Sequence, residues 1–330
     1  MIKLTILSQK ERETIHTAGK QILDEVGVKV RNENIYNRLL DAGARPDEND
    51  QTRLYFGEEM VKNPKVHGIT FTGSNAVGRK IGVWAAEHGK KFQLEMGGKN
   101  PVIVMPDCDL EQAATLTLRG AFGYAGQKCT ATSRAIVLES IYDAFVEKLV
   151  AKTRSIKVGP GKDESNFLPP VASEDQQTSI LDAIEKGKSE ACLLCGGGVP
   201  NGELYEHGFY VEPTLFGDVP LDSSLAQEEI FGPVLAIMRA RDLDEAIACA
   251  NHVRYGLSAS IFTRDLNSVL EYAGRIEAGV VKVNSETAGI EPQVPFGGMK
   301  DSSSHSREQG RAAMEFFTSI KSVYVDRAGN

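Results

Sequence analysis

From Val66 onward, short apolar runs alternate with longer segments whose apolar residues recur at helical spacing. This alternation predicts a mostly parallel sheet flanked by helices, because parallel neighbours need a crossover connection between them. The expected strands are 67–71, 91–95, 101–105, 134–138, 234–239, 258–263, 280–284 and 322–326. The expected helices are 74–88, 110–124, 141–153, 243–251 and 266–275. The fold class is therefore predicted to be α/β.

The first 60 residues have a different pattern. Ser8 and Glu11 form a capping box, and apolar residues then recur at helical spacing until Gly27. A second, shorter helix is expected over 34–43. We therefore expect a short helical N-terminal segment before the α/β part.

Length and charge limit the classes of partner. A chain of 330 residues with 41% hydrophobic content is long enough for two cores. Its net charge of -8 opposes a general attraction to nucleic acid or anionic lipid. The apolar stretch at the start is too short for a signal peptide, and no later run is long enough to span a bilayer. We expect a cytoplasmic protein without nucleic-acid or membrane partners.

The cysteines predict reduced thiols. Five scattered cysteines, an odd number, suit a reducing compartment. Cys192 and Cys195 have the C-x-x-C spacing of zinc and redox sites, but no second pair or adjacent histidine accompanies them. A closed zinc site needs four ligands, so this pair favours a short buried strand running into a turn. No metal site is expected.

Cys129 and Glu95 are the residues best suited to chemistry. A thiolate attacks a carbonyl carbon, and a carboxylate deprotonates water. Glu95 ends an expected strand and precedes Gly97 and Gly98, where the backbone can pass close to a ligand. The alternatives are a small buried thiol and an exposed glutamate at a strand end.

A glycine turn precedes the first helix of the α/β part. Gly73 and Ser74 stand between an expected strand and an expected helix, and Gly78 follows one turn later. Free N–H groups and the helix dipole favour a phosphate at such a position. The alternative is simple helix capping.

These runs together resemble the NAD(P)-dependent aldehyde dehydrogenases over residues 63–330. The similar runs are Phe122–Cys129, Leu94–Lys99, Glu228–Val234 and Pro295–Gly298. The resemblance implies oxidation of an aldehyde to a carboxylate with NAD or NADP, through a cysteine thiohemiacetal and thioester. It also implies that Cys129 is the nucleophile and Glu95 the base for thioester hydrolysis. The implied cofactor contacts are Gly73, Ser74 and Gly78 at the pyrophosphate, Glu229 at the nicotinamide ribose and Phe231 beside the nicotinamide ring.

The resemblance is more specific in two later segments. Residues 284–289 and 294–298 look most like the branch that acts on semialdehydes such as 2-oxoglutarate semialdehyde. Residues 302–308 depart from the glycine-containing version of the family.

The resemblance also implies a domain organisation. A helical N-terminal segment (1–60) precedes a partial, Rossmann-type dinucleotide-binding domain (61–98) and a catalytic domain (99–294). A C-terminal helix and an oligomerisation strand (295–330) follow, and they predict a homo-oligomer. The cofactor domain is expected to be incomplete, because nothing before Gly73 matches the family's oxyanion-hole asparagine, adenosine-ribose lysine or NAD-selecting acidic residue.

Two other interpretations remain. In the first, the chain is a truncated or fused remnant that folds or associates without turnover. In the second, it is related to the corrinoid methyltransferases. The second rests on residues 4–59, which resemble the N-terminal lead-in of the trimethylamine:corrinoid methyltransferases, although their catalytic barrel has no counterpart here.

Overall fold

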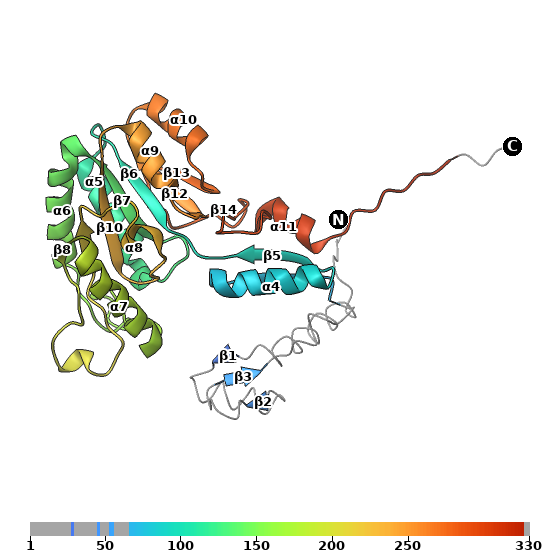
Figure 1. Cartoon of the computed structure of the whole chain (residues 1–330), viewed down its shortest axis with the longest axis horizontal. Helices are drawn as coiled ribbons and strands as arrows, with labels where there is room; N and C mark the ends of the chain where they lie inside the picture. Colours follow the sequence, from blue (N-terminus) through green and yellow to red (C-terminus); the bar gives the residue numbers. More distant parts are fainter. Residues whose placement is uncertain (1–27, 30–44, 47–52, 56–65, 327–330) are drawn as a thin grey trace. The chain divides into compact units, whose positions relative to one another are not determined.

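The structure is a computed structural model that describes residues 28–29, 45–46, 53–55 and 66–326 (Figure 1). The chain divides into two compact units. The first holds the described residues up to Phe71 together with Arg79–Gln93, and the second holds Thr72–Gly78 together with the chain from Leu94 onward. Each unit is described by itself.

The first unit contains one small sheet and most of the residues of a second. Strands β1 (Val28–Lys29), β3 (Arg53–Tyr55) and β2 (Arg45–Pro46) form an antiparallel sheet with β3 in the centre. Strands β4 (Gly68–Thr72) and β5 (Lys91–Glu95) pair with each other and are joined through helix α4 (Asn75–Glu87).

The predicted strands 67–71 and 91–95 and the predicted helix 74–88 are thus confirmed to within a residue or two. The N-terminal helices predicted over 8–26 and 34–43 lie outside the described residues. Where the first 60 residues are described, they form the short strands β1, β2 and β3.

The second unit is built on a seven-stranded sheet of order β13-β12-β6-β7-β10-β9-β8. All neighbouring strands are parallel except β8, which runs antiparallel to β9 at one edge. The strands are β6 (Asn100–Val104), β7 (Thr132–Leu138), β8 (Cys192–Cys195), β9 (Thr214–Gly217), β10 (Val234–Ala240), β12 (Ser258–Phe262) and β13 (Val280–Val283). A separate antiparallel pair joins β11 (Tyr255–Gly256) to β14 (Met299–Lys300).

Helices connect the strands, and in Figure 1 the sheet lies between α5 and α6 on one side and α9 and α10 on the other. The α-helices are α5 (Leu110–Phe122), α6 (Tyr142–Arg154), α7 (Glu174–Glu190), α8 (Ser224–Gln227), α9 (Leu243–Asn251), α10 (Leu266–Arg275) and α11 (Gly310–Phe317). Three short 3₁₀ turns span Gly123–Gly126, Glu139–Ile141 and Glu203–Tyr205. Aspartates begin three helices: the carboxylates of Asp109, Asp242 and Asp265 accept from backbone N–H groups in the first turns of α5, α9 and α10.

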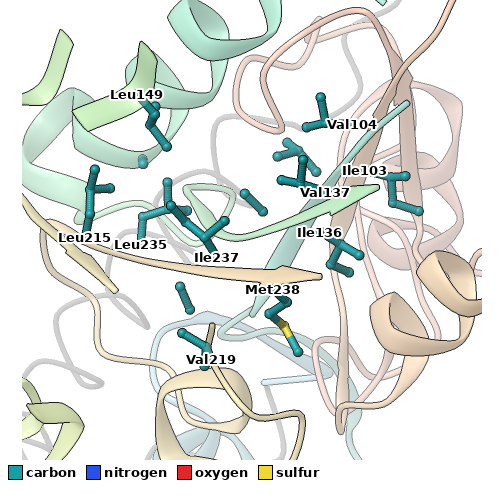
Figure 2. Packing of buried hydrophobic residues seen from close by; sticks show 14 of the residues in the cluster. Ile103, Val104, Ile136, Val137, Leu149, Leu215, Val219, Leu235, Ile237 and Met238 are labelled. Atoms are coloured by element: carbon teal, nitrogen blue, oxygen red, sulfur yellow. The ribbon is translucent and has the colours of Figure 1, made fainter. Parts of the chain in front are cut away.

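The central strands are buried on both faces. Every residue of β6 and β12 is buried, and adjacent residues such as Ile136 and Val137 of β7 are both fully buried. Because neighbouring side chains of a strand point to opposite faces, this burial requires cover on each side of the sheet. Figure 2 shows part of that packing, with side chains of β6, β7 and β10 meeting Leu149 of α6 and Leu215 of β9.

A buried cation ties the amino ends of the sheet together. The Arg134 side chain is fully buried and donates to three backbone oxygens: from Nε to Lys99 O at 2.9 Å, from Nη1 to Cys249 O at 3.0 Å and from Nη2 to Ala250 O at 2.7 Å. Burial lowers the pKa of this guanidinium to about 10, which leaves it charged at neutral pH. The charge therefore joins the start of β7 to the residues before β6 and to the end of α9.

Three features differ from the expectations. Helix α7 and strand β9 were not predicted, because α7 buries only a narrow stripe of Ile180, Ile184 and Gly187. The run 192–195 is a strand, but it lies at the sheet edge and Cys192 is exposed, so the prediction of a buried strand is wrong. Residues 322–326 form no strand, because a strand needs a hydrogen-bonded neighbour and the described residues of the chain offer none.

In the described part of the chain, no helix has both the length and the apolar character needed to cross a membrane.

Candidate active site

Three of the candidate residues, Cys129, Glu229 and Phe231, lie at the amino edge of the seven-stranded sheet. The segment 96–99 leads into β6, Cys129 precedes β7, and Glu229 and Phe231 precede β10. Since β6, β7 and β10 are parallel neighbours, their amino ends lie at one edge, and three segments that are far apart in sequence come together there.

The side chain of Asn100 holds the backbone at Cys129. Its Nδ2 donates to Cys129 O and to Ala131 O, both at 2.8 Å, and its Oδ1 accepts from the N–H of Ser258 at 3.0 Å. Asn100 is itself buried. A Cβ on Gly98 would lie only 2.8 Å from Cys129 O, so this glycine permits the close approach. Gly98 was expected from the sequence to allow a close backbone approach, whereas no role was predicted for Asn100.

The Cys129 thiol is half-buried among groups that raise its pKa. Burial is the main cause that raises its pKa, and the negative charges of Glu229 and Glu95 raise it further, whereas the N–H of Thr130 lowers it. The ammonium group of the adjacent Lys128 lies over the Tyr124 ring, with its Nζ 3.9 Å from the ring centre. The surroundings of the thiol therefore favour its protonated form.

The turn before Cys129 is left-handed and tightly packed. Tyr124, Ala125 and Gly126 have φ values of 56°, 55° and 67°. A Cβ on Gly126 would overlap the backbone oxygen of Gly232, so only glycine fits where this turn meets the segment before β10. The contact brings the segment of Glu229 and Phe231 against the segment of Cys129.

Glu95 is a buried carboxyl group at the end of β5. Its Oε2 accepts a 2.6 Å hydrogen bond from the Ser303 hydroxyl, and its Oε1 has no hydrogen-bond partner among the described residues. Burial is the main cause that raises its pKa to about 8; the Ser303 bond lowers it, Glu308 raises it and Arg307 lowers it. A carboxyl with this pKa becomes a base as the pH rises through about 8.

Glu229 is held against the glycine pair. Its Oε1 accepts from the N–H of Gly98 at 2.9 Å, and a Cβ on Gly97 would overlap its carboxylate. Burial raises the pKa of Glu229, while the Gly98 N–H and the charges of Lys99 and Arg254 lower it. The sequence marked Glu229 and both glycines, and the structure shows why the glycines are needed.

Lys99 and Phe231 complete this side of the site. Lys99 is 2% exposed, and burial lowers its pKa to about 7, with the charge of Glu229 acting in the opposite direction. Phe231 adopts a φ of 55° and keeps 39% of its surface exposed. A small cavity of about 20 Å³ is lined by both residues together with Glu229 and Ser133, whose buried hydroxyl has no partner in the described structure.

The glycine turn lies next to Glu95. The N–H of Gly73 donates to Glu95 O at 3.0 Å, and Ser74 caps α4, with Ser74 O accepting from Gly78 N at 2.9 Å. Gly78 therefore lies inside the first turn of the helix rather than in the loop. Gly73 and Ser74 are exposed, so the helix start is open to a ligand.

Among the residues that the structure describes, no group of three or more His, Cys, Asp or Glu side chains could hold a metal ion.

Residues 52–323 match the family model described as "Aldehyde dehydrogenase family". The chain belongs to the aldehyde dehydrogenase family. It is 51% identical over 270 residues to the alpha-ketoglutaric semialdehyde dehydrogenase of Bacillus subtilis, covering 82% of this chain and 55% of that protein. It is 48% identical over 270 residues to the alpha-ketoglutarate semialdehyde dehydrogenase of Haloferax volcanii, covering 81% and 56%.

Solved structures agree with the family. The aldehyde dehydrogenase of Mycobacterium tuberculosis in complex with NAD+ matches with a TM-score of 0.79 and 38% identity, over 85% of this chain and 56% of that one. The betaine aldehyde dehydrogenase of Staphylococcus aureus in complex with NAD+ matches with a TM-score of 0.76 and 31% identity, over 86% and 56%.

The chain spans about half the length of the curated relatives that it matches. The family match begins at residue 52, within the segment that also resembled the methyltransferases. The comparisons give no support to a methyltransferase-related N-terminal segment.

Proposed function

We propose that this chain oxidises an aldehyde to a carboxylate with NAD+ or NADP+ as hydride acceptor. The observation that supports this proposal most is that a buried carboxyl of raised pKa and a second carboxylate both lie within electrostatic range of a half-buried thiol. These three groups are Cys129, Glu95 and Glu229. A site of this kind combines a nucleophile, a base and a cofactor anchor.

The acyl chemistry is assigned to the protein's own residues. The sulfur of Cys129 adds to the aldehyde carbon and the thiol proton passes to the aldehyde oxygen, which gives a thiohemiacetal. Loss of hydride from its carbon to the nicotinamide acceptor and of its hydroxyl proton to solvent would leave a thioester on Cys129. Glu95 then takes a proton from water as the water oxygen bonds to the acyl carbon. The carbon–sulfur bond breaks, its electron pair returns to Cys129, and Glu95 releases the proton to solvent.

The residues around the cavity fit a nicotinamide cofactor. The N–H of Gly98 donates to Oε1 of Glu229, which leaves Oε2 to accept from the ribose hydroxyls. Phe231 is partly exposed, so its ring can pack against the nicotinamide ring. Gly73 and Ser74 form the open helix start that suits the pyrophosphate, and Gly78 lies within the first turn of that helix. When bound, the nicotinamide ring supplies the hydride acceptor.

We propose a semialdehyde such as 2-oxoglutarate semialdehyde as the substrate. Support comes from the two curated relatives described above, which carry that activity in their names. The segments 284–289 and 294–298, which resembled this branch, follow β13 and precede β14.

We also propose the domain limits 1–60, 61–98, 99–294 and 295–330.

We expect NAD(P)+-dependent oxidation of 2-oxoglutarate semialdehyde to exceed that of betaine aldehyde in kcat/KM, and Cys129→Ala to reduce both to background, since the thiol forms the bond to substrate. Cys192→Ala is the matched control, because that thiol lies on the far edge strand β8. NADH absorbance is the measurement. Equal turnover in Cys129→Ala and the parent chain would refute the assignment.

Hydrolysis of p-nitrophenyl acetate tests Cys129 and Glu95 without a hydride acceptor. Release of the acyl group should rise as the pH passes about 8, because Glu95 is a base only when ionised. Glu95→Gln should slow acyl release by about 100-fold or more and leave the initial burst nearly intact. Stopped-flow absorbance separates the two phases, and a variant that slows the burst alone would contradict the role of Glu95.

Glu229→Gln should weaken NADH binding by about 10- to 100-fold, because hydrogen bonds to a charged acceptor are lost. Glu228→Gln is the matched control, since Glu228 is mostly exposed and lies 3.9 Å from Arg254 in a loose ion pair. NADH fluorescence titration measures both. Equal affinities for the two variants would remove Glu229 from the cofactor site.

We propose that the chain forms a homo-oligomer through its C-terminal segment. Ile320, Val323, Tyr324 and Val325 are between 73% and 95% exposed, which is costly for apolar side chains so close together. Combined Val323→Lys and Val325→Lys changes should lower the mass in solution, and Val199→Lys on an exposed loop should not. Light scattering gives the mass, and a monomeric parent chain would disprove the proposal.

A further inference from the structure

Ser303 is a buried hydroxyl that touches Glu95. It is 4% exposed and follows β14, within the run 302–308 that departs from the family's glycine-containing version. Its hydroxyl donates to Oε2 of Glu95 at 2.6 Å, and its Oγ accepts from the N–H of Gly298, also at 2.6 Å. The bond from the Gly298 N–H is short for its type, and the bond to Glu95 has the usual length for a hydroxyl donating to a carboxylate.

The backbone holds Ser303 in place independently of its side chain. The N–H of Met96 donates to Ser302 O at 2.8 Å, and the N–H of Ser304 donates to Leu94 O at 3.1 Å. The Ser304 hydroxyl also accepts from the N–H of Leu94 at 2.8 Å. These bonds flank Glu95 and Ser303 on both sides, so removal of the Ser303 hydroxyl need not move the strand.

The Gly298 N–H determines which way the serine proton points. A backbone N–H can only donate, so it occupies one lone pair of the Ser303 oxygen. The hydroxyl proton is then directed at Oε2 of Glu95. A carboxylate accepts such a bond with both oxygens still able to act as acceptors, whereas a protonated acid competes for it as a second donor. The arrangement therefore favours the ionised form of Glu95.

The other groups that act on Glu95 oppose one another. Burial disfavours its charge, as does the neighbouring Glu308, while Arg307 favours it. The Cys129 thiol is also within electrostatic range of Glu95. Ser303 gives Glu95 a direct hydrogen bond, whereas Oε1 is buried and is left without a partner among the described residues.

We propose that Ser303 is a positioning residue that holds Glu95 by one oxygen, favours its ionised form and leaves the other oxygen to act as the base. This inference rests on the proposed function only for the role given to Glu95. The effect of Ser303 on the ionisation of Glu95 depends only on the hydrogen bond between the two side chains.

A titration of the carboxyl group tests that link without any turnover. With ¹³C-labelled glutamate side chains in the full chain, Glu95→Gln identifies the Glu95 resonance, whose midpoint is expected near pH 8 in the parent protein. Ser303→Ala should raise the midpoint by about one pH unit, because a hydrogen bond to the charged form is lost. Ser304→Ala is the matched control and should leave the midpoint unchanged, since its hydroxyl bonds Leu94 instead.

A second variant separates the hydroxyl from the packing. Ser303→Cys nearly keeps the shape of the side chain but has a weaker donor, so the midpoint should rise by a smaller amount than in Ser303→Ala. If Ser303→Ala does not fold, this variant carries the test. An unchanged or lowered midpoint in Ser303→Cys, or in a folded Ser303→Ala, overturns the proposal.

The rate of acyl release then relates the link to catalysis. At pH 7, Ser303→Ala should release the acetyl group of p-nitrophenyl acetate about tenfold more slowly, because a midpoint raised by about one pH unit leaves about a tenth as much Glu95 ionised. Above both midpoints, the variant should match the parent rate. An equal loss at every pH indicates a merely structural role and overturns the proposal. A higher midpoint in Ser303→Ala without hydrolysis in the parent chain instead contradicts the proposed function alone.

Discussion

The hydrogen bonds of the buried Asn100 side chain are the interaction on which the rest of the site depends. The side-chain amide of Asn100 bonds to the backbone of Cys129, of Ala131 and of Ser258. These bonds cross three neighbouring strands, β12, β6 and β7, at their amino ends. The parallel pairing brings these segments to one edge of the sheet, and the Asn100 side chain holds the Cys129 backbone there.

Burial is the second constraint, and it shifts the pKa of every ionisable group described in the site toward the neutral form. Removal from water raises the pKa of the acids Glu95, Glu229 and Cys129 and lowers the pKa of the bases Lys99 and Arg134. Every one of these groups is thus closer to its neutral form than it would be in water. Burial therefore favours the protonated forms of the thiol and of the carboxyl groups, and for Glu95 the Ser303 hydroxyl opposes that effect.

Local sequence patterns predicted most of the central sheet. The strands over 101–105, 134–138, 234–239, 258–263 and 280–284 appear as β6, β7, β10, β12 and β13 within two residues at either end. They were predictable because a buried parallel strand is a continuous apolar run. Strand β9 and helix α7 were missed, because a four-residue strand and a narrowly apolar helix give weak patterns. The exposed thiol of Cys192 was missed because the position of a strand within the sheet is not a local property.

The sequence by itself determined the family, the α/β class and the residues that meet at the sheet edge, since the runs around Glu95, Cys129 and Glu229 are contiguous and carry their own glycines. Only the tertiary structure decided which residues support them. Asn100 is 29 positions from Cys129, and Ser303 is 208 positions from Glu95. Contacts over such separations depend on strand order and on the turn after β14, and no local pattern encodes the direction of a hydroxyl proton. That direction is set by a backbone N–H which only the folded chain brings within reach.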